Sequence, residues 1–530
     1  MDINKFLYNY GYNQEFNLAV SDEVKAFADK IPESEFKKRK CLFDWQIVTI
    51  DGDDSKDFDD AVSIKKLKNG KFELGVHIAD VSHYVTEGSA LDAEAYNRGT
   101  SVYLVDTVVP MLPEKLSNDL CSLVPHKPRL TISCLMKIDS QGNVEEYKIF
   151  ESAIKSCARL TYHKVSQVLE GNMCARNEYA DFVEMFENMR QLALILRDKR
   201  MRRGAIDFDF PEPYFELDEN GRVVDVRARE LSISNKIIEE FMLAANETVA
   251  KHCQKFEIPS VYRVHEEPDP EKIQKLVNLV RIFGHKLKSG DKISPKAMQR
   301  LLFRVDGTNA QTVLSTAMLR AMMKARYCEE NLGHFGLAAD YYCHFTSPIR
   351  RYPDLLVHRI LKEWLKGDLD EWRITHYNRV TSRAAEQSTH TELDAITAER
   401  DYDDFMCCEY MEDKIGQEFN GIISSVTDFG FFVELPNTVE GLVRMVDLSD
   451  DYYEFNEDTM FLTGRRTGRI FCMGQPVTVR VAKVNTELKQ IDFVLTDMIV
   501  DEKPKEVKHK VGKQRGKHTK KGRKKKYRSK

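Results

Sequence analysis

The sequence predicts an α+β protein in which a large domain of mixed strands and helices precedes a small all-β barrel. Three observations favour this fold class. Strand-like runs flank an acidic loop near residue 50, and apolar residues recur at helical spacing in residues 232–256 and 389–415. Short strands separated by turns then fill residues 416–497, which is typical of a closed barrel.

Composition narrows the class of protein further. The 530 residues are 42% hydrophobic, and no apolar run is as long as a membrane span, so we expect several domains and no membrane partner. The first residues, Met1–Phe6, lack the charged-then-apolar order of a signal peptide. Eleven cysteines without a CxxC pair are typical of reduced thiols. These features predict a cytoplasmic protein.

Residues 1–40 form a short lead-in to the large domain, which we expect to occupy residues 41–415. Val24, Phe27 and Ile31 recur among charged residues in the lead-in at the spacing of one helix face. The sequence therefore predicts a helical segment there.

An acidic loop dominates the start of the large domain. Six of the ten residues in Asp51–Asp60 are aspartates, directly after the strand-like run Trp45–Ile50. Carboxylates this dense repel one another, so they need cations or backbone donors to stay ionised together. A solvated acidic loop is one alternative, and a calcium loop fails because Lys56 and Val62 stand where the EF-hand needs Gly and Glu. Oxygen ligands of this kind suit Mg²⁺ or Mn²⁺ and most often serve phosphoester cleavage.

Two helices are expected later in this domain. The segment Ser232–Phe256 carries apolar residues at helical spacing, and Ser232 or Ser234 can cap its start. The segment Thr389–Ile415 is a second amphipathic stretch, with apolar residues among acids. We expect the methionines and aromatic residues of both helices to lie in the core.

The strands of residues 416–497 suit an OB-fold barrel. Phe429, Phe431 and Phe432 flank Gly430, so at least one ring is expected to point outward. An exposed ring beside basic residues can stack on a nucleic-acid base. Core packing can absorb two of the three rings, so both interpretations stay open for each of them.

The net charge of −5 hides a strong asymmetry between the body and the tail, residues 498–530. Residues 503–530 contain 15 Lys or Arg and a single acid, Glu506, for a charge of about +14, which leaves about −19 on the rest. Such a run cannot bury apolar surface, and we expect it to be disordered. It predicts nucleic-acid binding through counterion release, with a solvated solubility tail as the alternative.

Five segments of the large domain form an ordered set: Thr49–Val62, Val76–Tyr84, Pro110–Asn118, Arg203–Phe208 and Thr346–Asp354. Together they resemble the motifs of the RNB family of 3′→5′ exoribonucleases, the family of ribonuclease II and ribonuclease R. The segment from residue 416 is similar to the S1 RNA-binding domain of that family. The basic tail is more typical of the ribonuclease R branch.

The resemblance implies an RNB catalytic domain followed by an S1 domain. Ribonuclease R usually has cold-shock domains ahead of the catalytic domain, and this sequence begins only about 50 residues before the acidic loop. We therefore expect those domains to be absent, and the handling of duplex RNA stays open.

The resemblance also implies roles for individual residues. The acids expected at the metal site are Asp51, Asp57, Asp59 and Asp60, with Asp59 also catalytic, and the cofactor is Mg²⁺ or Mn²⁺. Arg350 is expected to contact the scissile phosphate, with Arg351 beside it. A structural ion pair is the alternative for either arginine.

Other residues are expected to hold RNA by the same resemblance. Tyr103 and Phe208 match positions whose rings bracket the bases near the 3′ end, and stacking accepts every base. Tyr162 and Glu239 match positions that contact ribose. The remaining candidates are a site-lining acid, Glu399, and two histidines that are expected to be structural, His77 and His83.

The implied function is processive 3′→5′ hydrolysis of single-stranded RNA to nucleoside 5′-monophosphates, without sequence preference and with two metal ions. The resemblance also suggests a monomer, and the tail is expected to attach to the ribosome or to other RNA-turnover factors. Two alternatives stay open. One is a non-enzymatic RNA-binding protein, and the other is a nuclease that cuts DNA or cuts RNA internally.

Overall fold

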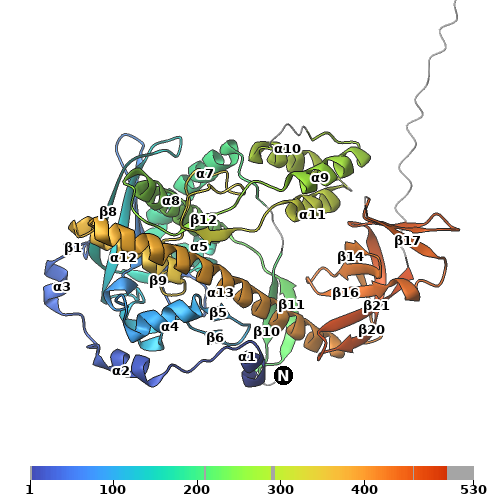
Figure 1. The fold of residues 1–530 in the computed structure, drawn as a ribbon, viewed down its shortest axis with the longest axis horizontal. Coiled ribbons are helices and arrows are strands. Elements are labelled where there is room, and N and C mark those ends of the chain that lie inside the picture. Colours follow the sequence, from blue (N-terminus) through green and yellow to red (C-terminus); the bar gives the residue numbers. More distant parts are fainter. Residues whose placement is uncertain (1–2, 208–210, 288–292, 309, 458, 498–530) are drawn as a thin grey trace, which may run out of the picture.

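The computed structural model describes residues 3–207, 211–287, 293–308, 310–457 and 459–497. A large α+β domain lies at one end of the molecule and a β-barrel at the other (Figure 1). The helix α13 (Glu371–Glu412), 42 residues long, runs from one to the other. The predicted fold class is confirmed.

A seven-stranded mixed sheet forms the centre of the large domain, in the order β1-β8-β7-β4-β3-β2-β9. Its inner strands pair antiparallel, whereas β1 and β9 join the two edges in parallel. The bounds of its strands are β1 (Lys40–Cys41), β2 (Val48–Asp51), β3 (Asp60–Lys66), β4 (Phe72–Ala79), β7 (Pro128–Ile138), β8 (Val144–Lys155) and β9 (Ala158–Thr161). The acidic loop therefore connects two neighbouring strands, β2 and β3.

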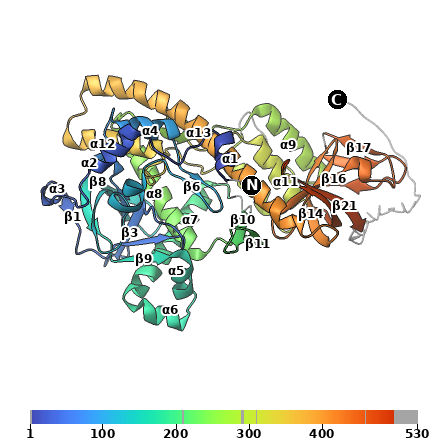
Figure 2. The ribbon, with the colours of Figure 1, turned by 90° about the horizontal axis from the view of Figure 1, so that it is seen from below.

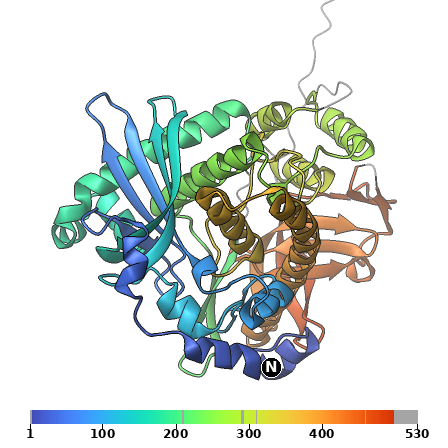
Figure 3. The same cartoon turned by 60° about the vertical axis from the view of Figure 1, so that its left-hand side comes forward.

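Two long helices cover one side of this sheet, α7 (Val183–Arg203) and α8 (Ile233–Lys255) (Figure 3). The predicted helix at 232–256 is thus confirmed. Ser232 caps it, because its side chain and that of Asn235 satisfy each other's backbone N–H groups. Shorter elements complete this part: η1 (Val81–His83), α4 (Ala90–Arg98), η2 (Lys115–Leu120), α5 (Tyr162–Leu169), α6 (Met173–Glu178) and η3 (Ala180–Phe182).

The lead-in is helical, as predicted, but it is broken into three short pieces. These are α1 (Ile3–Asn9), α2 (Leu18–Ala26) and α3 (Glu33–Lys37). Val24 is buried, and Phe27 ends α2 in an extended conformation, so it does not continue the helix. Figure 2 shows α1 near the middle of α13, far along the chain from it.

Smaller elements lie between the sheet and the barrel. Three helices form a group above α13 in Figure 1: α9 (Pro270–Ile282), α10 (Pro295–Val305) and α11 (Gln311–Ala321). The paired strands are β5 (Val102–Tyr103) with β6 (Val108–Val109), β10 (Pro213–Leu217) with β11 (Val223–Ala228), and β12 (Tyr262–Val264) with β13 (Arg326–Cys328).

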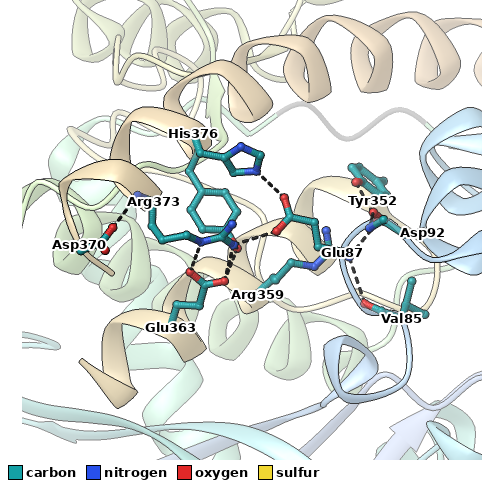
Figure 4. Close-up of polar contacts among 11 residues, drawn as sticks. Val85, Glu87, Asp92, Tyr352, Arg359, Glu363, Asp370, Arg373 and His376 are labelled. Carbon is teal, nitrogen blue, oxygen red and sulfur yellow. Dashed lines mark hydrogen bonds and ion pairs between the residues drawn. The ribbon is translucent and has the colours of Figure 1, made fainter. Parts of the chain in front are cut away.

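The helix α13 begins 18 residues before the segment that its apolar pattern predicted at 389. Its first turns are held by ion pairs. Arg373 donates to Glu363 of α12 (Tyr352–Lys366), with Nε 2.8 Å from Oε2, and to Glu87 at 2.8 Å (Figure 4). Asp370 caps the helix by accepting from the backbone N–H of Arg373. Tertiary charge pairs, which have no helical period in the sequence, account for the missed start.

The C-terminal strands form the predicted closed barrel, in the order β14-β15-β16-β21-β20. Their bounds are β14 (Glu418–Thr427), β15 (Gly430–Glu434), β16 (Glu440–Arg444), β20 (Pro476–Asn485) and β21 (Gln490–Asp497). Gly430 is needed where two strands approach closely, since a Cβ there would stand 2.2 Å from the carbonyl oxygen of Val443. A small sheet extends the barrel: β17 (Tyr453–Asn456), β18 (Phe461–Gly464) and β19 (Ile470–Phe471), with η4 (Met445–Asp447) before it.

The two domains are tied together beside α1. Asp401 of α13 accepts hydrogen bonds from the Tyr10 hydroxyl and from Lys489, which lies in the barrel's β20–β21 turn. The apolar residues Phe6 and Leu7 of α1 are buried against this part of α13. Within the described ranges, no helix is both long and apolar enough to cross a membrane. All eleven cysteines are free thiols.

Candidate active site

The four acids predicted at the metal site lie at the ends of β2 and β3 and in the loop between them. Asp51 ends β2, Asp60 begins β3, and Asp57 and Asp59 precede β3. Asp59 is only 5% exposed. The neighbouring Asp53 and Asp54, which the sequence set aside, are exposed. The strand ends thus hold four carboxylates at one edge of the sheet.

Burial leaves these carboxylates poorly solvated. Burial, and then the charges of Asp60 and Asp57, raise the pKa of Asp51 well above its usual range. Burial raises the pKa of Asp59 as well, and that of Asp60 to about 6, although Arg350 opposes both shifts. The buried Oδ2 atoms of Asp51 and Asp59 have no hydrogen-bond partner. Unpartnered buried carboxylate oxygens of this kind fit a divalent cation, because a cation would restore their charged form.

The described residues do not form a closed metal cage. No three His, Cys, Asp or Glu side chains among them already stand together as a metal site. The carboxylate oxygens, two of them buried without a hydrogen-bond partner, are donors of the kind that Mg²⁺ or Mn²⁺ prefers.

The two adjacent arginines have different surroundings. Arg350 is 43% exposed at its side chain and faces the acids, with its Nε 3.9 Å from Oδ2 of Asp59. Arg351 instead donates from Nε and from one terminal nitrogen to the buried Asp354, at 2.9 and 2.7 Å. The structure thus leaves Arg350 available to a phosphate and gives Arg351 the ion pair that was its structural alternative.

Three more candidates gather around the acids. The Tyr103 hydroxyl donates to Oδ2 of Asp57 at 2.8 Å, and its backbone N–H donates to Glu399 at 2.9 Å. The ring of Tyr103 is 38% exposed, so a base can reach it. Burial, and then the charges of Asp60 and Asp51, raise the pKa of Tyr162.

For two other predicted site residues, Phe208 and Glu239, no contact with the acids is among those that the structure describes. Phe208 lies outside the described residues. Glu239 is exposed on α8, 3.6 Å from Arg200, whose buried partner is the adjacent Glu240 at 2.7 Å. No described contact joins Glu239 to the acids, so its role stays a prediction.

The two histidines are structural, as predicted. His77 is fully buried between Ser63 and Ser133, at 2.9 and 2.6 Å, and burial lowers its pKa to about 3. His83 is half-buried in η1, and burial lowers its pKa too. Neither faces the acidic loop.

The barrel phenylalanines divide into two groups. Phe429 is 51% exposed, and the half-buried Phe432 meets it edge to face at 6.1 Å. The prediction that Phe431 binds RNA is wrong, because this ring is fully buried and stacked on Phe471 at 4.8 Å. Alternation along β15 turns Phe431 into the core and its neighbour outward.

Sequence reasoning missed two contacts that shape the site. The backbone N–H of Ile349 donates to Oδ1 of Asp59 at 2.8 Å, and Asp354 holds both Arg351 and the N–H of Ser347. A backbone donor has no signature in a sequence. Asp354 had one, since an acid three residues after Arg351 is a typical ion-pair spacing at a helix start.

Comparison with known families agrees with this geometry. The model of the RNB domain matches residues 39–367, and that of the S1 RNA binding domain matches residues 412–495. The chain belongs to the RNB family. Its RNB domain thus contains the acidic loop and both arginines, and its S1 domain is the barrel. RNB ribonucleases are metal-dependent, which fits the unpartnered acids.

Several proteins with similar sequences are ribonucleases R. Ribonuclease R 1 of Lactococcus lactis is 45% identical over 494 residues, which cover 93% of this chain and 60% of the relative. Ribonuclease R of Thermotoga maritima is 46% identical over 487 residues, covering 91% and 68%. The chain therefore spans about two thirds or less of the length of these relatives.

A solved structure shares the fold. Mycoplasma genitalium RNase R in complex with ribose methylated single-stranded RNA superposes with a TM-score of 0.87 at 30% identity. The match covers 93% of this chain and 78% of that protein.

Proposed function

We propose that this chain is a metal-dependent 3′→5′ exoribonuclease that degrades single-stranded RNA to nucleoside 5′-monophosphates. One observation carries the proposal: four carboxylates, two with unpartnered buried oxygens, face a half-exposed arginine beside an exposed aromatic ring. Hydrolysis of a phosphodiester needs these parts, namely acids for metal ions, a cation for the phosphate and a platform for the base.

The acids would hold two Mg²⁺ or Mn²⁺ ions, which would activate the attacking water and stabilise the departing oxygen. The residues of the chain supply the rest. Asp59 is held by the Ile349 N–H through Oδ1 and keeps Oδ2 free on the side of Arg350. Arg350 would donate to the scissile phosphate, since its side chain is half-exposed there. Arg351 would keep its neighbour in place through Asp354.

The bound RNA strand would lie along the exposed rings and polar groups. Tyr103 and Phe208 would stack on the last bases, and Tyr162 and Glu239 would contact ribose. Stacking accepts every base, so degradation would be independent of sequence. It would be processive if these groups kept the strand bound between successive cuts. Phe429 and Phe432 of the S1 domain would contact the strand farther from the cut.

The protein would act in RNA turnover and processing, as a cytoplasmic monomer. Its eleven free thiols support a reducing compartment. The basic residues 503–530 would bind RNA phosphates or attach the enzyme to ribosomes or other RNA-turnover factors.

Digestion of labelled RNA tests the proposal. Uniformly labelled single-stranded RNA in Mg²⁺ is expected to yield nucleoside 5′-monophosphates from the first time point, whereas DNA of the same sequence persists. Asp59→Asn is expected to release nucleotides at least about 10³-fold more slowly, because it removes one charge of the metal site.

Two results would contradict the proposal. A ladder of internal fragments would indicate an endonuclease. Equally slow release by the wild type and by Asp59→Asn would leave an RNA-binding protein without catalysis.

A further inference from the structure

The turn Ser347–Arg351, which presents Arg350, is fixed by a carboxylate outside the acidic loop. Asp354, fully buried in the first turn of α12, accepts the backbone N–H of Ser347 at 2.8 Å. The same carboxylate accepts both donors of Arg351, at 2.9 and 2.7 Å. The N–H of Arg351 donates back to the carbonyl of Ser347 at 3.0 Å. Asp354 thus holds both ends of the turn.

The middle of this turn faces the acidic loop. Ile349 gives its N–H to Oδ1 of Asp59 at 2.8 Å, and the next residue, Arg350, places its Nε 3.9 Å from Oδ2. The guanidinium of Arg350 also donates to the Ser347 hydroxyl at 3.2 Å. The orientation of Asp59 and the position of Arg350 therefore depend on the same few residues.

The other side of the turn is bonded to the segment that leads to Tyr103. The carbonyl of Arg350 accepts from the N–H of Ser101 at 3.0 Å and from the Thr100 hydroxyl at 3.1 Å. The N–H of Tyr352 donates to the carbonyl of Gly99 at 2.9 Å. The turn is therefore hydrogen-bonded on this side to the segment that precedes Tyr103.

We propose that Asp354 is a positioning residue for the reaction, which sets Asp59 and Arg350 in register through the turn Ser347–Arg351. The inference rests on the proposed function. Asp354 is fully buried and its described hydrogen bonds come from Ser347 and Arg351, so it would act through the turn. Small displacements at a reacting centre can cost about 10²-fold in rate, which makes such a residue visible in kinetics.

The chain offers a matched control in Asp92 of α4, a carboxylate that pairs with the same helix, α12. Asp92 is 8% exposed and pairs with Arg359 of α12 at 2.8 Å and with the Tyr352 hydroxyl at 3.0 Å (Figure 4). Like Asp354, it is a buried carboxylate that neutralises an arginine of α12. None of its described hydrogen bonds comes from residues 347–350, so we expect its loss to cost stability and to disturb the turn much less than the loss of Asp354.

The experiment compares Asp354→Asn with Asp92→Asn. Asparagine keeps the size of the side chain but turns an amide N–H₂ toward the donors of Arg351. The single-turnover cleavage rate of Asp354→Asn is expected to fall about 10²-fold. Its Kd for the same RNA in EDTA should stay within about 2-fold of wild type, because stacking rings and the S1 domain bind the strand. Asp92→Asn should lower Tm comparably and change the rate by less than about 3-fold.

A milder variant guards against misfolding. Arg351→Lys keeps the buried charge pair and loses the two-point grip on Asp354. We expect a Tm near wild type and a cleavage rate about 10-fold lower, with unchanged RNA affinity. A loss of RNA affinity instead of rate would mean that Arg351 contacts RNA directly, which contradicts the proposal.

Mn²⁺ binding gives a readout that needs no cleavage. Electron paramagnetic resonance of the RNA-free protein should show about 10-fold weaker Mn²⁺ binding for Asp354→Asn than for wild type or Asp92→Asn, because Asp59 is no longer held. Rates that fall in proportion to Tm in both variants, or an unchanged rate and Mn²⁺ affinity in Asp354→Asn, would overturn the proposal. If wild type binds Mn²⁺ but releases no nucleotides, the proposed function fails, and this comparison still decides the role of Asp354.

Discussion

Asp59 and Asp80 are both buried carboxylates of the large domain, but their hydrogen-bond partners and their pKa values differ. Asp80 is 1% exposed and receives two hydrogen bonds from Lys362, one from Ser82 and an ion pair from Arg39 at 2.6 Å. Burial alone would raise the pKa of Asp80, but Lys362 and Arg39 lower it far below its usual range.

Asp59 is buried almost as deeply, yet it has one backbone hydrogen bond, one unpartnered oxygen and a raised pKa. Both carboxylates are buried. They differ in whether basic side chains neutralise the negative charge, as they do for Asp80, or leave one oxygen without a hydrogen bond, as in Asp59. A buried acid with its charge neutralised holds the fold together, whereas one left without a partner is available to a ligand.

The largest change in stability is expected when the charge of Asp80, the carboxylate with its partners, is removed. Asp80→Asn leaves Lys362 and Arg39 buried without their carboxylate, so the free energy of unfolding should fall by about 3–5 kcal/mol. Urea unfolding measures this loss, and the cleavage rate per folded molecule should stay near wild type. A loss below about 1 kcal/mol would mean that Glu151, 3.2 Å from Arg39, takes over the pairing.

The second effect is a dependence of stability on pH in the metal-free protein. The folded pKa of Asp60 is about 6, above its unfolded value near 4, so the folded state binds more protons between these values. Stability should therefore decline as pH rises from about 4 through about 6, by up to about 3 kcal/mol. Melting curves in EDTA measure the decline.

Two controls sharpen the pH prediction. Asp60→Asn should reduce the decline between pH 4 and 6, with Asp51 and Asp59 accounting for what remains, and saturating Mg²⁺ should oppose it, because the ion binds the ionised acids. A metal-free wild type that gains stability as pH rises over this range would contradict the assignment of Asp60 as an unsatisfied acid.

A smaller effect is expected for Asp59 itself. In EDTA near pH 8, Asp59→Asn should raise the free energy of unfolding by about 1–2 kcal/mol, since it removes a buried charge and keeps the acceptor for Ile349. The same substitution is expected to slow nucleotide release at least about 10³-fold, so stability and activity should move in opposite directions. Thermal melting with and without Mg²⁺ checks this, and lower metal-free stability would show that the charge was satisfied after all.

The smallest expected effect concerns two uncharged side chains of the barrel, the exposed Phe429 and the buried Phe431. Phe429→Ala should weaken the binding of single-stranded RNA by about 1 kcal/mol, because it removes an exposed stacking ring, and should leave Tm unchanged. Phe431→Ala is the control and should destabilise the barrel by about 3–5 kcal/mol. Fluorescence anisotropy with labelled RNA, beside melting curves, separates the two. Equal affinities for wild type and Phe429→Ala would remove this ring from the interface.

The sequence predicted those parts of the molecule that local patterns determine. The acidic loop between two strands, the helix α8 with its serine cap, and the closed barrel follow from apolar period and turn residues. The motifs also selected four acids and Arg350. The structure places the acids at the adjoining ends of β2 and β3 and in the loop between them, with Arg350 3.9 Å from Asp59.

Other features depend on distant residues and could not be predicted. The start of α13 rests on Arg373 pairing with Glu87, which lies 286 positions away in the chain. The buried side of Phe431 depends on strand register in the barrel, and the hydrogen bond from Ile349 to Asp59 uses a backbone group. Each of these is fixed by tertiary contacts that leave no local pattern.

The junction at Asp401 has a consequence for how the protein is made. Tyr10 and Lys489 meet on this carboxylate, although 479 positions separate them. Tyr10 is translated long before Lys489, so their contact at Asp401 can form only once nearly the whole barrel has been translated. This junction is therefore among the last tertiary contacts that the described chain can complete.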